Sequence, residues 1–261
     1  MDRCEARFSL DGRVAIVTGG AGLYGRHIAQ ALAEAGAHVV LAARGVDACE
    51  AAAEELRSAG LSATAHPLDL TREESVRAVR DDVRRAHGRI DVLVNNAVAR
   101  GGGDMDHTSR EQWVATSTVN STGLFLMTRE VGEVMVEQRS GSIINIASIY
   151  GVVGPDFSLY GDTGMTNPAF YAYDKGGMIS FTRYLAMFYA PAGVRVNCLS
   201  PGGLATPDQP EEFVRNYQQR VPLGRLAGPD DIKGPVVFLA SDASDYVTGV
   251  NIPVDGGWTA H

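Results

Sequence analysis

Long apolar runs, paired cysteines and clusters of basic residues are all missing from this 261-residue chain. Without a stretch of about 18 apolar residues, no membrane-spanning helix is expected. The three cysteines, Cys4, Cys49 and Cys198, lie far apart and lack metal-ligand spacing, so we expect free thiols and no metal site. Residues 1–11 are charged and lack the apolar core of a signal peptide, which favours a cytoplasmic protein.

The charge balance excludes further classes of partner. The chain has 31 acidic and 23 basic side chains, for a net charge of −8. It therefore offers no electrostatic footprint for nucleic acid or for an anionic membrane surface. Its 30 glycines follow no fixed period, which excludes collagen-like and solenoid folds. An acidic chain can still bind a phosphate group through backbone amides, so a nucleotide ligand stays open.

Short apolar segments alternate with helical patterns along the whole chain, and no Pro/Ser-rich linker divides it. We expect strands at residues 14–17, 39–42, 63–67, 91–94, 141–146, 194–199 and 251–254. Helices are expected at residues 26–35, 47–59, 73–87, 170–189 and 229–239, with one or two more between 110 and 137. This alternation predicts one α/β domain over residues 1–261, a doubly wound (Rossmann-type) parallel β-sheet with helices on both faces.

A glycine-rich turn, Thr18-Gly-Gly-Ala-Gly-Leu-Tyr-Gly25, joins the first predicted strand to the first helix. Gly19, Gly22 and Gly25 allow positive φ and let backbone amides approach a pyrophosphate closely. The helix N-terminus behind the turn adds partial positive charge. This context favours a dinucleotide site, and a tight turn without a ligand is the alternative.

The second predicted strand ends near Arg44, where the adenine ribose of a dinucleotide is expected. An acidic residue at this place would bind a free 2′-hydroxyl, but the chain has Ala43 and Arg44 there. The Arg44 guanidinium could instead bind a 2′-phosphate, which favours NADP over NAD. If Arg44 is only a solvated surface charge, NAD binding remains possible.

Tyr171 and Lys175 lie four residues apart on a predicted helix, so their side chains share one face. The chain has only one other lysine, Lys233, and uses arginine at its remaining Lys/Arg positions. A lysine kept at position 175 suggests that a compact ammonium is needed there. An ammonium stabilises a nearby phenolate, so such a tyrosine can exchange protons with an alcohol near neutral pH. Tyr173 faces elsewhere on the same helix and is interpreted as structural.

Ser148 and Asn120 are two further candidates. Ser148 follows the predicted strand 141–146, and ligands of open α/β sheets bind outside the carboxyl ends of the strands. No Gly-x-Ser-x-Gly elbow surrounds Ser148, which disfavours a serine hydrolase. Asn120 lies within a helical stretch, where asparagine is mildly unfavourable, and a solvent-facing side chain is the alternative for it.

Together these residues resemble the short-chain dehydrogenase/reductase family over nearly the whole chain. Residues 18–25 resemble the family's cofactor turn, and Asn95-Asn-Ala97 resembles its Asn-Asn-Ala-Gly segment. Pro201-Gly202 with Thr206 resembles the segment that flanks the nicotinamide, and residues 247–257 resemble the C-terminal signature. The family's catalytic tetrad is expected at Asn120, Ser148, Tyr171 and Lys175.

The resemblance implies an NAD(P)-dependent oxidoreductase that moves a hydride between nicotinamide and a substrate carbon without a metal. Tyr171 would be the general acid/base, and Lys175 would hold the nicotinamide ribose and favour the phenolate. Ser148 would position the reacting oxygen, and Asn120 would support a proton relay through water. The cofactor-binding residues would be Gly19, Gly22, Tyr24, Gly25, Arg44, Asp69, Leu70, Asn96, Tyr171, Lys175, Pro201, Gly202 and Thr206. A homo-oligomer, either dimer or tetramer, is also implied.

Three features depart from the family's pattern. Leu23 occupies the usual middle-glycine position of the cofactor turn, which could change how the turn holds the pyrophosphate. Val98 replaces the glycine that usually follows Asn-Asn-Ala and could crowd the cofactor floor. The interval of 22 residues between Ser148 and Tyr171 is longer than the family usually shows.

The interval 149–170 is polar and glycine-rich, so we expect a loop over the active site, with residues 203–220 completing the substrate side. Asp156, Asp162 and Asn167 would suit a hydroxylated substrate, and replacing them by alanine should raise its KM. A sugar, a sugar acid such as gluconate or a polyol fits this description and points to carbohydrate metabolism. A surface loop without a substrate role is the alternative.

Two other functions stay open. One is reduction of a 3-oxoacyl thioester, although this acidic chain offers no obvious basic surface for an acidic carrier protein. The other is a nucleotide-binding protein that keeps the fold but has no turnover, which the intact tetrad disfavours.

Overall fold

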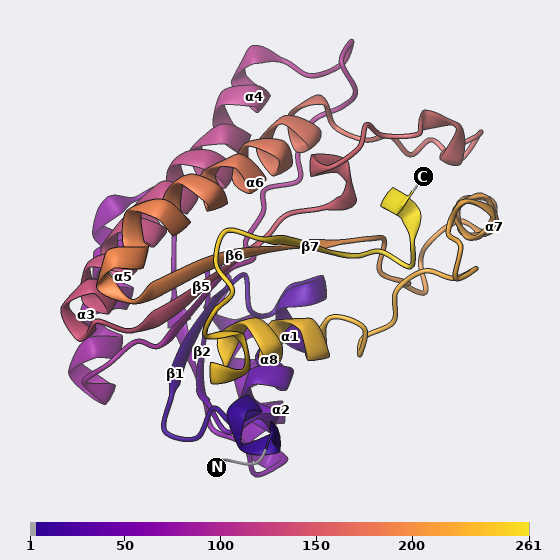
Figure 1. Ribbon diagram of the computed structural model, residues 1–261. Coiled ribbons are helices and arrows are strands. Elements are labelled where there is room, and N and C mark those ends of the chain that lie inside the picture. The colour runs from indigo at the N-terminus through magenta and orange to yellow at the C-terminus, as the bar shows by residue number, and fades with distance from the viewer. Residues whose placement is uncertain (1–3, 261) are drawn as a thin grey trace.

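The computed structural model describes residues 4–260, so residues 1–3 and 261 of the predicted domain lie outside the described part. Seven parallel strands form one sheet in the order β3-β2-β1-β4-β5-β6-β7 (Figure 1). Every predicted strand is present, and the doubly wound parallel sheet is confirmed. The strands are β1 Val14–Thr18, β2 His38–Ala43, β3 Ala63–Pro67, β4 Val92–Asn95, β5 Gly141–Ile146, β6 Val194–Pro201 and β7 Asn251–Val254.

Helices cover both faces of the sheet, as the alternating pattern predicts (Figure 1). One apolar layer joins the sheet to α1, α2 and α8, and the other joins it to α3, α5 and α6. No described helix is both long enough and apolar enough to cross a bilayer. The helices are α1 Leu23–Glu34, α2 Val46–Ser58, α3 Glu73–His87, α4 Arg110–Ser117, α5 Leu124–Gln138, α6 Ala169–Tyr189, α7 Glu211–Arg220 and α8 Lys233–Ala240.

The central strands are buried on both faces, which explains their continuous apolar sequences. All five residues of β1 and the last five of β5 are buried. Strand β1 pairs with β2 on one side and with β4 on the other, so the chain changes direction across the sheet at the β1–β4 boundary. Ligands of doubly wound folds bind at such a switch point, outside the carboxyl ends of the strands.

The helices differ from the sequence-based expectations by more than one residue at four places. Helix α1 begins at Leu23 rather than residue 26, and α8 begins at Lys233 rather than residue 229. The stretch 110–137 contains α4 and α5 joined by a π-helical segment, Thr118–Gly123. Helix α7 was not predicted, because its sequence is mostly polar. Its buried side chains are limited to Phe213 and Tyr217.

Candidate active site

The candidate residues gather at one edge of the sheet. Gly19, Arg44, Asn96, Ser148 and Gly202 each follow the carboxyl end of a strand, respectively β1, β2, β4, β5 and β6. Because all the strands are parallel, these ends meet at the same edge. The fold therefore brings together residues that are up to 183 positions apart in the sequence.

The glycine turn needs glycine at two of its three predicted positions. Gly19 has a φ of 64°, in the left-handed region that glycine favours. A Cβ on Gly25 would lie 2.1 Å from the Gly19 carbonyl oxygen, so no side chain fits there. Gly22 has an ordinary φ of −75°, and the Leu23 side chain is 47% exposed. This explains why a leucine is tolerated at the family's middle-glycine position.

Asn96 stabilises the glycine turn through three hydrogen bonds. Its side-chain amide donates to the backbone oxygens of Thr18 (3.0 Å) and Gly19 (3.1 Å). Its backbone N–H donates to the Thr18 hydroxyl at 3.0 Å. The sequence predicted Asn96 at the adenosine side, and the structure places it against the turn that borders that side.

A cavity of about 270 Å³ opens beside the turn and suits the adenosine half of a dinucleotide. It contains Gly19, Arg44, Asp69 and Leu70, four residues that the sequence assigns to the cofactor. Its apolar walls can contact a base, and the exposed Arg44 guanidinium stands at the end of β2. The full lining is Gly19, Ala42, Ala43, Arg44, Gly45, Leu68, Asp69, Leu70, Ala97, Val98, Ala99 and Val119.

The turn's other side faces the segment after β6. A second cavity, of about 500 Å³, includes both Gly22 and Thr206, which places the predicted nicotinamide-side segment next to the turn. The Tyr24 hydroxyl donates to the Gly202 backbone oxygen at 3.0 Å. Burial raises the pKa of Tyr24, so the hydroxyl keeps its proton for this bond. Tyr24 thus ties the glycine turn to the end of β6.

Lys175 is a buried lysine held in one orientation. Its Nζ donates to the Ile146 backbone oxygen at 2.6 Å and lies 5.7 Å from the centre of the Tyr171 ring. The side chain is 4% exposed, and the ion pairs of the described lysines involve Lys233 only. Burial lowers the pKa of the Lys175 ammonium, and Tyr171 opposes this shift electrostatically. The predicted tyrosine–lysine pair is therefore assembled at the carboxyl end of β5.

Ser148 lies at the same strand end to which Lys175 is bonded. It is buried two residues after the end of β5, and its Oγ accepts a hydrogen bond from the Tyr150 backbone N–H at 3.2 Å. The short 3₁₀ helix that follows, Ile149–Gly151, packs on α6 so closely that a Cβ on Gly151 would lie 2.7 Å from the Lys175 backbone oxygen. This packing fixes the Ser148 turn against the helix that carries Tyr171 and Lys175.

Asn120 is buried in the π-helical segment, so the solvent-facing alternative is wrong for it. Its Oδ1 accepts from the Ala99 backbone N–H at 2.7 Å, and its Nδ2 donates to the Ala99 oxygen at 3.2 Å. Nδ2 also donates to Asp174 Oδ2 at 2.9 Å. Asp174 was not predicted, although its place directly before Lys175 on α6 could have drawn attention to it.

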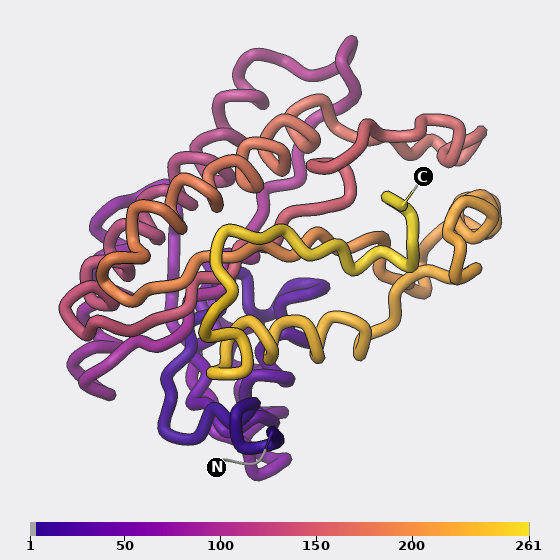
Figure 2. The backbone as a smooth tube through the Cα atoms, in the orientation of Figure 1, coloured from indigo at the N-terminus to yellow at the C-terminus, as the bar shows by residue number. Residues whose placement is uncertain are grey.

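The segment predicted to cover the substrate side, residues 149–170, packs on α7 through aromatic side chains. Tyr160 of the 149–170 segment stacks on Phe213 of α7, with ring centres 5.9 Å apart. Asn216 Nδ2 donates to the Leu159 oxygen at 3.2 Å, and Arg220 pairs with Asp156 at 2.9 Å. Figure 2 shows the 149–170 segment and α7 at the same end of the molecule, near the C-terminus. Asp156 therefore joins two segments, whereas the sequence placed it among the substrate-binding groups.

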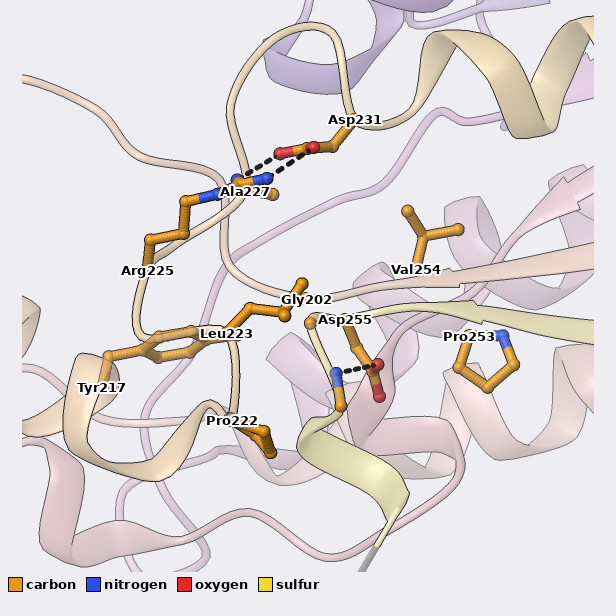
Figure 3. Close-up of a pocket in the computed structure, with 12 residues that line it drawn as sticks. Gly202, Tyr217, Pro222, Leu223, Arg225, Ala227, Asp231, Pro253, Val254 and Asp255 are labelled. Carbon is orange, nitrogen blue, oxygen red and sulfur yellow. Dashed lines mark hydrogen bonds and ion pairs between the residues drawn. The ribbon is translucent and has the colours of Figure 1, made fainter.

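A further cavity, of about 520 Å³, lies beyond Gly202, between Tyr217 and the end of β7 (Figure 3). Arg225 and Asp231 form a bidentate ion pair at the edge of this cavity, with N–O distances of 2.5 and 2.9 Å. Its lining contains none of the four predicted catalytic residues. Gly202 is the one predicted cofactor residue among the residues that line it.

Comparison with known proteins places the chain among reductases and dehydrogenases. A family model described as enoyl-(acyl carrier protein) reductase matches residues 22–259. The chain is 34% identical to the 3-oxoacyl-(acyl-carrier-protein) reductase FabG of Thermotoga maritima, over 95% of this chain and 98% of the relative. It is 35% identical to a 2-dehydro-3-deoxy-D-gluconate 5-dehydrogenase of Pseudoalteromonas atlantica, over 97% of this chain and 98% of the relative.

A solved structure gives a similar picture. The crystal structure of a gluconate 5-dehydrogenase from Burkholderia cenocepacia, in complex with NADP and tartrate, matches with a TM-score of 0.88 and 32% identity. The match covers 99% of this chain and 100% of that one. Because relatives with different substrates are almost equally similar, identity alone does not select the substrate of this chain.

Proposed function

Because the chain belongs to the short-chain dehydrogenase/reductase family, an oxidoreductase family that acts on CH–OH and C=O groups, we propose that it oxidises or reduces a sugar, sugar acid or polyol with NADP(H). The nicotinamide, when bound, supplies or accepts the hydride. The protein supplies the proton and the alignment. The observation that carries this proposal is the buried Lys175 ammonium fixed beside Tyr171 at the carboxyl end of β5.

The proton is exchanged by the Tyr171 hydroxyl in this proposal. The Lys175 ammonium, held by the Ile146 oxygen, stabilises negative charge that develops on the phenol oxygen. Ser148 Oγ accepts a bond from the Tyr150 N–H, which leaves its own hydrogen free to donate to the reacting oxygen of the substrate. These roles need no metal ion.

The preference for NADP rests on Arg44 in this proposal. Arg44 lines the adenosine cavity at the end of β2, where no carboxylate faces a 2′-phosphate from that strand. The acid in the same cavity, Asp69, is occupied, since its Oδ1 accepts from the Thr71 N–H (3.0 Å) and hydroxyl (2.7 Å). Arg44 forms no ion pair with the described residues, so its guanidinium can bind a phosphate on the ribose.

Replacing Arg44 by aspartate should lower kcat/KM with NADPH by about 100-fold and raise kcat/KM with NADH. A charge-assisted phosphate contact of roughly 2–3 kcal/mol is lost, and the new carboxylate can bind a free 2′-hydroxyl. Steady-state kinetics with both cofactors measure the change. Arg72→Ala is the matched control, because Arg72 is a nearby exposed arginine that pairs with Glu74. An unchanged cofactor ratio in Arg44→Asp would show that Arg44 is only a surface charge.

Two groups near the catalytic helix favour a hydroxylated acid as substrate. Asn167 is 8% exposed, and its Oδ1 has no hydrogen-bond partner among the described residues. Buried amide oxygens are normally paired, so this one suits a substrate hydroxyl. Arg100 forms no ion pair within the described part of the chain. Burial is the largest cause that lowers the pKa of Lys175, and the positive charge of Arg100 lowers it further. Arg100 therefore carries positive charge to the site, where it would attract a carboxylate.

Replacing Asn167 by alanine should raise the KM for a hydroxylated substrate about 10-fold and change kcat less than about threefold. The loss corresponds to one hydrogen bond that binds the ground state and the transition state alike. The sequence assigned binding of substrate hydroxyls to Asp156, Asp162 and Asn167 together. Because Asp156 pairs with Arg220 and the Asn167 Oδ1 has no partner among the described residues, Asn167 is the strongest candidate of the three. Thr166→Ala, an exposed change in the same segment, serves as the control. An equal KM in Asn167→Ala and wild type would reject the role.

A substrate panel tests the proposed function directly. We expect turnover of sugar acids such as gluconate, slower turnover of neutral polyols, and little reduction of an acetoacetyl thioester, each with NADP(H) and NAD(H). Turnover of the thioester alone would replace the proposal by 3-oxoacyl reduction, which the FabG relative represents. No turnover of any compound would favour a nucleotide-binding protein without catalysis.

We also propose that the protein forms a homo-oligomer through α5 and α6. Phe125 on α5 and Tyr184, Met187 and Phe188 on α6 are exposed apolar side chains, and Met187 is 81% exposed. Exposed apolar patches of this kind mark association surfaces. A second copy of the chain would cover the patch. Sedimentation of a single monomeric species at micromolar concentration would contradict this.

A further inference from the structure

Asp174 is a buried carboxylate that belongs neither to the predicted catalytic tetrad nor to the predicted cofactor-binding residues. It is 6% exposed and lies on α6 directly before Lys175. Adjacent helical residues do not share a face. Lys175 reaches the Ile146 oxygen, whereas Asp174 accepts from Asn120 Nδ2 at 2.9 Å and from Ser121 Oγ at 3.1 Å. Burial of a carboxylate against neutral donors is costly, so its retention at this place calls for a reason.

The carboxylate determines which way the Asn120 amide points. A carboxylate can only accept hydrogen bonds, so the Asn120 atom facing Asp174 must be the nitrogen. The same nitrogen donates to the Ala99 oxygen at 3.2 Å, which uses both of its hydrogens. Asn120 Oδ1 then accepts from the Ala99 N–H at 2.7 Å. A flipped amide would place like groups together at all three contacts.

This chain of contacts joins two parts of the site. Ala99 lines the adenosine cavity, and α6 carries Tyr171 and Lys175. The link between them runs through Asn120, in the π-helical segment where the regular α-helical pattern between α4 and α5 is interrupted. The Asp174–Asn120–Ala99 contacts therefore connect the wall of the cofactor cavity to the catalytic helix.

We propose that Asp174 is a positioning residue. It acts through Asn120 to hold α6, the helix that carries Tyr171 and Lys175, in a fixed position relative to the adenosine cavity. This inference rests on the proposed function, because it assumes that the register matters for hydride and proton transfer. It predicts that the loss of Asp174 affects both kcat and cofactor affinity. It also predicts that these effects disappear when Asn120 is already absent.

A double-mutant cycle with Asn120→Ala and Asp174→Leu tests the proposal. We expect Asp174→Leu to lower kcat about 30-fold and to weaken NADPH binding about fivefold, and the double variant to be no worse than Asn120→Ala alone. Asp174→Asn should retain activity within about threefold, because its oxygen can accept from Asn120 and its nitrogen can donate to Ser121. If Asp174→Leu does not fold, Asp174→Ala takes its place in the same cycle.

The control is Asp91→Asn, which changes a 3% exposed carboxylate at the opposite end of the sheet, bonded to the Val14 N–H at 2.9 Å. It should lower the Tm and leave kcat and the NADPH Kd unchanged. Multiplicative losses in the double variant would overturn the proposal, as would an Asp174→Asn variant as impaired as Asp174→Leu. Calorimetry of NADPH binding needs no turnover. If the wild type transfers no hydride, the proposed function is rejected. The NADPH Kd values of the single and double variants then still decide whether Asp174 acts through Asn120.

Discussion

Replacement of Tyr171 by phenylalanine should lower kcat/KM by about 10³-fold or more and leave the cofactor Kd within about twofold of wild type. General acid/base catalysis contributes about 10²–10⁴-fold, and no described group replaces the phenol beside Lys175. The change removes one oxygen from a half-buried ring, so the fold and the cofactor cavity should be unaffected. Steady-state kinetics and calorimetric titration with NADPH measure the two quantities.

Tyr173→Phe is the matched control for this experiment. Tyr173 lies on the same helix, is 67% exposed, and has its ring centre 5.4 Å from that of Trp113, away from Lys175. Its loss should leave kcat/KM unchanged. Equal activity of Tyr171→Phe and wild type would show that the Tyr171 hydroxyl does not exchange the proton, and the mechanism proposed for this chain would be rejected.

The parts of the fold that follow from local pattern could be predicted from the sequence. The parallel sheet follows from apolar segments that alternate with helices, and the shared face of Tyr171 and Lys175 follows from helical spacing. The need for glycine at Gly19 and Gly25 follows from their place between strand and helix. These features depend on residues close together in the chain.

The features that the sequence did not reveal depend on contacts between distant segments. Asn120 is buried because Asp174, 54 positions away, accepts its amide hydrogen, and no local pattern encodes that bond. Helix α7 forms on a polar sequence because Phe213 packs on Tyr160 of another segment. Gly22 has an ordinary φ, but a Cβ there would lie 3.1 Å from the Gly19 oxygen, so close packing rather than backbone conformation favours glycine at this position.

Lys175→Met should have effects of opposite sign on catalysis and on stability. Without the ammonium, kcat/KM should fall by about 10²-fold or more, because the charge that stabilises the phenolate is lost. The free energy of unfolding should rise by about 1–2 kcal/mol at pH 7, because a buried charge without a carboxylate partner is replaced by an apolar side chain. A rise in Tm of roughly 2–6 °C follows for a chain of this size. Thermal unfolding of the cofactor-free protein measures it.

The chain supplies its own control, since it has one other lysine. Lys233 on α8 pairs with Asp230 at 3.1 Å and Glu34 at 3.5 Å and is partly exposed. Lys233→Met should leave kcat/KM unchanged and should not raise the Tm. A Lys175→Met variant that is both inactive and less stable than wild type would show that the bond to the Ile146 oxygen outweighs the burial of the charge.

The stability gain of Lys175→Met should also depend on pH in a defined direction. Burial lowers the pKa of Lys175 in the folded state below its ordinary value of 10.5. Between the two values the unfolded chain binds more protons than the folded chain, so the stability of the wild type rises with pH in that window. The penalty for the buried ammonium is complete below the folded-state pKa and is gone above 10.5. The Tm difference between Lys175→Met and wild type should therefore shrink as pH approaches 10.5. A Tm difference that stays constant over this range would show that the stability change does not come from the Lys175 charge.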